Sequence, residues 1–96
     1  MTDYRKLARN QECLVRLSGC DGGGETTVLA HLRMAGYCGT GMKPDDVAFG
    51  AWCCGPCHAK IDGREPCELT HEQLHSAHAD GVLRTVAALR KIGAIK

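Results

Sequence analysis

The stretch over residues 53–62 carries the side chains from which proteins build metal sites. Cys54 and Cys57 form a Cys-x-x-Cys pair, His58 follows at once, and Asp62 lies four residues further on. A Cys-x-x-Cys pair brings two thiolates to one tetrahedral ion, usually zinc. On a helix, His58 and Asp62 share a face and can bind a second ion. The spacing therefore indicates a structural metal beside a functional one.

Cys13 and Cys20 are the predicted partners of Cys54 and Cys57, because four thiolates are a common closed zinc shell. The interval between Cys13 and Cys20 is wider than in a usual zinc knuckle. Cys53 is an alternative to Cys54 at a spacing one residue longer. The sequence thus predicts a structural Zn²⁺ held from two distant parts of the chain.

Seven cysteines in a chain of 96 residues are compatible with either disulfides or metal binding. The count is odd, and the N-terminal segment lacks the apolar core of a signal peptide. We therefore expect a reducing, cytoplasmic setting in which thiolates bind zinc. Cys38 and Cys67 have no partner at ligand spacing and are predicted to be small free thiols. No apolar run approaches membrane-spanning length, so no membrane partner is expected.

The pattern of the chain predicts a single α+β domain over residues 1–96, with a core over about residues 11–64. The predicted elements are a helix over residues 3–10, a strand over 25–31, a loop over 35–46, a second strand over 47–52 and a helix over 56–63. β-branched residues favour the first strand, an apolar run favours the second, and Pro56 suits the first turn of a helix. A core this small is commonly stapled by a metal.

C-terminal helices are predicted over about residues 70–93. Thr70 and Gln73 form a capping box at their start, Gly81 is expected to interrupt them, and residues 82–92 are amphipathic. Residues 81–96 carry four basic and no acidic side chains, although the net charge of the whole chain is only +1. Such a segment can follow a DNA backbone, but basic side chains also suit a helix C-terminus.

The order strand, loop, strand, helix would bring His31 against His58 and Asp62. A neutral imidazole at His31 can remove a proton from water. A divalent ion on His58 and Asp62 can stabilise charge on a phosphate oxygen and on a leaving group. Asp46 can orient His31 through its other ring nitrogen, or it can be an ordinary turn residue after Pro44.

His71, Glu72 and His75 spell the His-Glu-x-x-His pattern of zinc peptidases on a predicted helix. A third ligand would be needed. His78 lies about 10 Å further along the axis than His71, which is too far to join both on one ion. We therefore expect these histidines to be solvated or to have a secondary role.

These motifs together resemble the HNH (ββα-metal) nucleases, and among them the small prophage-encoded nucleases of the YbcO type. The resemblance covers most of residues 5–64. Its residues are Arg5-Lys6, Arg9, Glu12-Cys13, the segment ETTVLAHLR over 25–33, the glycine-rich loop with Lys43-Pro44 and Asp46, and Cys54-x-x-Cys57-His58 with Ile61-Asp62. A Cys-x-x-Cys-His pattern after a strand, combined with Ala-His-Leu-Arg, is a specific signature.

The resemblance implies a zinc-stapled ββα-metal domain with flanking helices that acts as an endonuclease on DNA. It would hydrolyse phosphodiester bonds and leave 5′-phosphate and 3′-hydroxyl ends. The family's general base falls on His31, its orienting residue on Asp46, and its ligands for a catalytic divalent ion on His58 and Asp62. Two basic residues near the loop are candidates for holding phosphate, namely Arg33 and Lys43.

Ala30 departs from the family pattern, because many members place an ion ligand directly before the base. The ion would then have two protein ligands together with water and phosphate. Mg²⁺ or Mn²⁺ tolerates such a shell, with Zn²⁺ or Ni²⁺ as alternatives. His31 could instead be a ligand itself. Ala30 also keeps open a second interpretation, a catalytically silent zinc module that binds nucleic acid or a partner protein.

Overall fold

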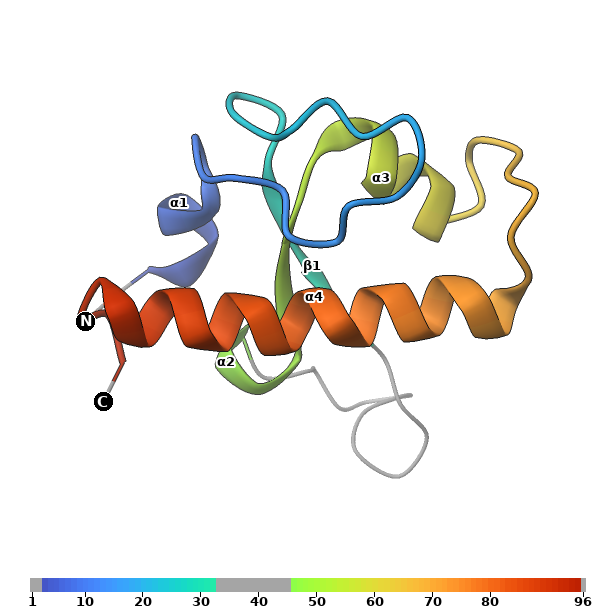
Figure 1. The fold of residues 1–96 in the computed structure, drawn as a ribbon. Coiled ribbons are helices and arrows are strands. Elements are labelled where there is room, and N and C mark those ends of the chain that lie inside the picture. Colours follow the sequence, from blue (N-terminus) through green and yellow to red (C-terminus); the bar gives the residue numbers. More distant parts are fainter. Residues whose placement is uncertain (1–2, 33–45, 96) are drawn as a thin grey trace, which may run out of the picture.

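A two-stranded antiparallel sheet crosses one long C-terminal helix, and shorter helices lie at either end of the sheet (Figure 1). The computed structural model describes residues 3–32 and 46–95. In chain order the elements are α1 (Tyr4–Ala8), β1 (Val28–His31), α2 (Asp46–Phe49), β2 (Gly50–Cys53), α3 (Gly55–Ile61) and α4 (His71–Lys91). The predicted α+β class is confirmed; α1 and β1 are each a few residues shorter than expected, and α3 begins one residue earlier and ends two residues earlier than expected.

The sheet has a different hydrophobic cluster on each face. Residues that pair directly across an antiparallel sheet share a face, and here Leu29 pairs with Trp52 while Ala30 pairs with Ala51. Leu29 and Trp52 belong to one cluster, and Ala30 and Ala51 belong to the other. All four residues of β2 are buried. The sheet is therefore a central layer that separates two small cores.

Helix α4 joins these two cores, since Val82 lies in one cluster and Leu89 lies in the other. At the C-terminal end of α4, helix α1 packs against the Leu89 cluster through Ala8. The Tyr4 hydroxyl donates a hydrogen bond to the Ala94 carbonyl at 3.3 Å. The first and last described segments of the chain therefore lie together, as Figure 1 shows at the N-terminal label.

The predicted second strand is wrong over its first three residues, because residues 46–49 form helix α2 and the strand begins only at Gly50. A Cβ atom at Gly50 would lie 2.3 Å from the Asp46 carbonyl oxygen. The chain thus turns from helix into strand at a point where no side chain fits. A short apolar run does not reveal such a turn, because buried helix and buried strand share its composition.

The predicted break at Gly81 is also wrong, because α4 is one continuous helix of 21 residues. A Cβ atom at Gly81 would lie 2.7 Å from Cγ2 of Val15. The glycine therefore lets α4 approach the segment that contains Val15 closely, and it does not end the helix. The predicted capping box is confirmed, since the Thr70 hydroxyl accepts from the Gln73 N–H at 3.1 Å and Gln73 Oε1 accepts from the Thr70 N–H at 2.9 Å. Within the described part of the chain, no helix is both long enough and apolar enough to cross a bilayer.

Candidate metal and catalytic sites

The four cysteines predicted to bind zinc lie together. The Sγ atoms of Cys13, Cys20, Cys54 and Cys57 are all within 4.8 Å of one another. Those of Cys20 and Cys54 are 3.7 Å apart. Two sulfurs bound at ~2.3 Å to one tetrahedral zinc would be about 3.8 Å apart. The geometry of this four-cysteine cluster therefore fits a closed zinc site, and Cys54 rather than Cys53 belongs to it.

Local backbone structure brings the distant halves of the four-cysteine cluster together. Cys54 is the N-cap of α3, and its Sγ accepts from the Cys57 N–H at 3.5 Å. On the other side, a bridge between Glu12 and Gly23 closes the loop that carries Cys13 and Cys20. A Cβ atom at Gly23, whose φ is +98°, would lie 2.5 Å from the Cys13 nitrogen. This closed loop explains how a spacing wider than a zinc knuckle still delivers two ligands to one ion.

The thiols of the four-cysteine cluster are not equally acidic. Burial raises the pKa of Cys54 to about 11 and raises that of Cys57 further. Burial also opposes ionisation of Cys13, but backbone N–H groups of Arg16 and Cys54 outweigh it and lower its pKa to about 7. Zinc binds thiolates, so binding must displace protons from Cys54 and Cys57. Cys53 lies beside the cluster, and burial raises its pKa so that it stays a thiol.

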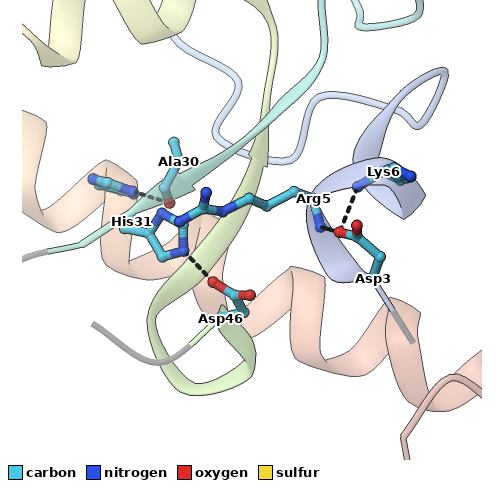
Figure 2. Close-up of polar contacts among 7 residues, drawn as sticks. Asp3, Arg5, Lys6, Ala30, His31 and Asp46 are labelled. Carbon is cyan, nitrogen blue, oxygen red and sulfur yellow. Dashed lines mark hydrogen bonds and ion pairs between the residues drawn. The ribbon is translucent and has the colours of Figure 1, made fainter. Parts of the chain in front are cut away.

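His31 and Asp46, the predicted base and its orienting residue, are in direct contact. Figure 2 shows the bond between His31 Nε2 and Asp46 Oδ1, which is 2.6 Å long. His31 is the last residue of β1, and Asp46 is the first residue of α2. The short helix that precedes β2 therefore places the carboxylate beside His31. The His31 side chain is 17% exposed. With its Nε2–H donated to a carboxylate, a neutral imidazole keeps its lone pair on Nδ1.

His58 and Asp62, the predicted ion ligands, meet across one turn of α3. His58 Nε2 lies 3.4 Å from Asp62 Oδ2. Two donor atoms at ~2.1 Å from one ion and at a tetrahedral angle would also be about 3.4 Å apart. Arg64, which the sequence patterns do not single out, lies 3.4 Å from His58 Nδ1 and 3.5 Å from Asp62 Oδ2. The pair thus fits an ion, with a guanidinium beside it.

A cavity of about 270 Å³ brings the two halves of the predicted site to one place. It lies between β1, α3 and α4. Its walls are His31, Leu32, Ile61, Asp62, His71, Leu74, His75 and His78. His31 and Asp62 therefore open onto the same space, whereas His58 stands beside Asp62 without contributing to the wall. Arg33 and Lys43, the predicted phosphate contacts, and Cys38 lie outside the described residues.

Of the two roles expected for the histidine-rich stretch, solvated or secondary, His78 has a secondary, structural one, whereas His71 and His75 are exposed. His78 is 4% exposed, and its Nε2–H donates to the Ala30 carbonyl at 2.9 Å. Burial lowers its pKa, so the ring is neutral. The signal was present in the sequence, since Leu74, His78, Val82 and Leu89 share one face of a helix. The ring ties α4 to β1 at the residue before His31.

Replacing His78 with Gln should flatten the pH dependence of stability. In the unfolded chain the His78 imidazole has the ordinary histidine pKa, near 6.5. In the folded protein burial lowers this pKa, so the ring takes up its proton only at a lower pH. The stabilisation is therefore complete above pH 6.5 and declines as the pH falls, by at most about 1.4 kcal/mol per pH unit. Denaturant unfolding of both proteins between pH 5 and 8 measures this. The difference between the two proteins cancels any acid release of zinc, and parallel curves would contradict the assignment.

These features define a small α+β protein with a four-cysteine site suited to zinc. The chain belongs to the family described as "Putative nuclease YbcO", which it matches over residues 2–94. This confirms the resemblance to nucleases of the YbcO type.

Two relatives are each 43% identical to the chain over 101 residues, covering 100% of this chain and 99% of theirs. They are "Putative nuclease YbcO" of Escherichia coli (strain K12) and "Putative nuclease ybcO" of Enterobacteria phage 82. A solved structure described as a putative bacteriophage protein from Escherichia coli str. K-12 substr. MG1655 is also similar. Its TM-score is 0.76 at 36% identity, covering 95% of this chain and 100% of that one. The relatives include a phage protein, in line with a prophage origin.

Proposed function

We propose that this protein is a metal-dependent endonuclease of the HNH type that hydrolyses DNA phosphodiester bonds. The observation that carries the proposal is the cavity onto which His31, bonded to Asp46, and Asp62, beside His58, both open. A base and an ion site on one cavity are what hydrolysis of a phosphodiester by activated water needs. The names of the relatives, which call them nucleases, point to the same class of reaction.

In this proposal His31 Nδ1 accepts a proton from the attacking water. Asp46 holds the other ring proton on Nε2, which fixes the tautomer and stabilises the imidazolium that forms. His58 and Asp62 would hold the divalent ion. The ion would supply Lewis-acid stabilisation of charge on the phosphate and on the leaving oxygen. Hydrolysis at the 3′ oxygen then leaves a 5′-phosphate.

The distribution of charge favours a polyanionic substrate. Arg5 and Lys6 of α1 and its C-cap residue Arg9 line a surface hollow of about 420 Å³. Arg90 and Lys91 end α4 at the same end of the molecule, where α1 packs (Figure 1). Within this group the opposing acid is Asp3, whose carboxylate caps α1 (Figure 2). Clustered cations of this kind bind phosphate backbones without regard to sequence.

A plasmid-nicking assay tests the proposal. Purified, zinc-loaded protein is incubated with supercoiled DNA and Mg²⁺, Mn²⁺, Ni²⁺ or Zn²⁺, and nicked product is expected with at least one ion and none with EDTA. DNA binding is measured in parallel by fluorescence anisotropy. If DNA binds but no ion supports cleavage, the alternative of a catalytically silent zinc module replaces the nuclease.

A further inference from the structure

Helix α4 places the histidines of the His-Glu-x-x-His motif on the wall of the candidate catalytic cavity. His71 and His75 are one helical turn apart, and both line the cavity onto which His31 and Asp62 open. The same two side chains also border a more open surface hollow, which they share with Glu72, Ser76 and Ala79. The cavity thus has one wall from β1, one from α3 and a third, made largely of imidazoles, from α4.

The lining fits a cation better than an anion. Among the described residues that line the cavity, Asp62 is the one Asp, Glu, Lys or Arg, and its charge is negative. This carboxylate repels a phosphate that enters the cavity, and the guanidinium of Arg64, 3.5 Å from Asp62 Oδ2 but outside the lining, offsets only part of its charge. Imidazole nitrogen combined with carboxylate oxygen is instead the donor set that first-row transition metals prefer. The third wall thus adds ligands of the type that a metal at Asp62 can use.

His75 is the better placed of the two histidines. His78, three residues further along α4, bonds to the carbonyl of Ala30 beside His31, so His75 lies about one helical turn from the point where α4 meets β1. His75 is exposed, and the structure gives its ring no hydrogen bond or ion pair within residues 3–32 and 46–95. Its side chain is therefore free to turn. His71 is the first residue of α4 and lies about two helical turns from His78.

We propose that His75 is a third protein ligand of the ion held by His58 and Asp62, which makes the site selective for Mn²⁺, Co²⁺, Ni²⁺ or Zn²⁺ over Mg²⁺. The inference rests on the proposed function for the existence of that ion. Among the described residues, the four-cysteine cluster is the one group of three or more ligands whose donor atoms already lie together. Binding therefore requires the His75 ring to turn toward Asp62.

A cobalt titration of the zinc-loaded protein tests this ligand set. Visible absorption and calorimetry follow Co²⁺ binding, with and without a DNA duplex, in the wild type, His75→Ala and His71→Ala. The wild type should bind one Co²⁺ beyond its zinc. Removing an outer-shell partner commonly weakens metal binding 10–100-fold, so loss of a direct ligand in His75→Ala should cost at least about tenfold. His71→Ala should bind as the wild type does, and His75→Asp should restore part of the affinity.

Circular dichroism and zinc content establish that each variant is folded. Equal Co²⁺ affinity in wild type and His75→Ala, or no second Co²⁺ in the wild type, would overturn the inference. Equal weakening by His71→Ala and His75→Ala would also overturn it, in favour of a site on the His-Glu-x-x-His motif. If His75-dependent binding is found but no ion supports DNA cleavage, the ion site stands and the nuclease falls. If cleavage is found and His75→Ala binds Co²⁺ normally, the reverse holds.

Discussion

His31→Ala is expected to lower the rate of DNA nicking by about 10²–10⁴-fold, the usual contribution of a general base. The side chain that is lost bonds to Asp46 and opens onto the cavity, but it is not part of either hydrophobic cluster. The free energy of unfolding should therefore change little. Single-turnover nicking at saturating protein measures the chemical step, and DNA anisotropy should show unchanged affinity.

Two further variants make the result specific for a base. His71→Ala removes an exposed imidazole from the same cavity wall and should leave the nicking rate unchanged. Asp46→Asn keeps an acceptor for the His31 Nε2–H but loses the charge that stabilises the imidazolium, so it should cause a smaller loss than His31→Ala. If His31→Ala nicks DNA at the wild-type rate, His31 is not the base. A loss of bound metal in the same variant would instead make His31 a ligand.

Loss of zinc from the four-cysteine cluster is expected to unfold the protein. Structural zinc sites bind with roughly 10–16 kcal/mol, which matches or exceeds the roughly 5–15 kcal/mol of net stability of a typical domain. Cys54→Ser is the sharpest single change. A serine can still cap α3, as Cys54 does now, so the variant removes the metal ligand and keeps the cap. Far-UV circular dichroism and zinc content should fall together.

Cys67→Ser is the matched control for Cys54→Ser. Cys67 is half-buried and lies outside the four-cysteine cluster, so the change should alter the free energy of unfolding by no more than about 0.5 kcal/mol and leave the zinc content intact. Chelation of the wild type should reproduce the Cys54→Ser result. A chelated protein that still unfolds cooperatively would contradict a structural role for the metal.

The four-cysteine cluster and the contact between His31 and Asp46 could be predicted from the sequence because few chemistries use those residue types at those spacings. A four-thiolate zinc shell needs two cysteines besides the Cys-x-x-Cys pair. Few other cysteines are present in the chain, and Cys13 and Cys20 are the pair predicted. The pairing of His31 with Asp46 followed from a strand-loop-strand order that the structure confirms as an antiparallel pair. What these residues catalyse is still a proposal.

The wrong predictions of secondary structure have one physical origin. Tertiary contacts decide between local conformations that the sequence alone allows. The run after Asp46 can be helix or strand, and the close approach at Gly50 selects helix followed by strand. Gly81 can break a helix, but its contact with Val15 needs a glycine inside one. The position of Arg64 beside His58 depends on how the chain turns at the end of α3, and residue spacing does not predict that turn.

The contact between α1 and the end of α4 affects when the chain can fold during its synthesis. Helix α1 is made before α4, yet its packing partners include Leu89, and Tyr4 bonds to Ala94. Cys13 likewise has to wait for Cys54 and Cys57 before it can share a metal. Domains generally fold as units during synthesis, and here nearly the whole described chain must emerge before that unit is complete. Until then the first segment is exposed to proteases and chaperones.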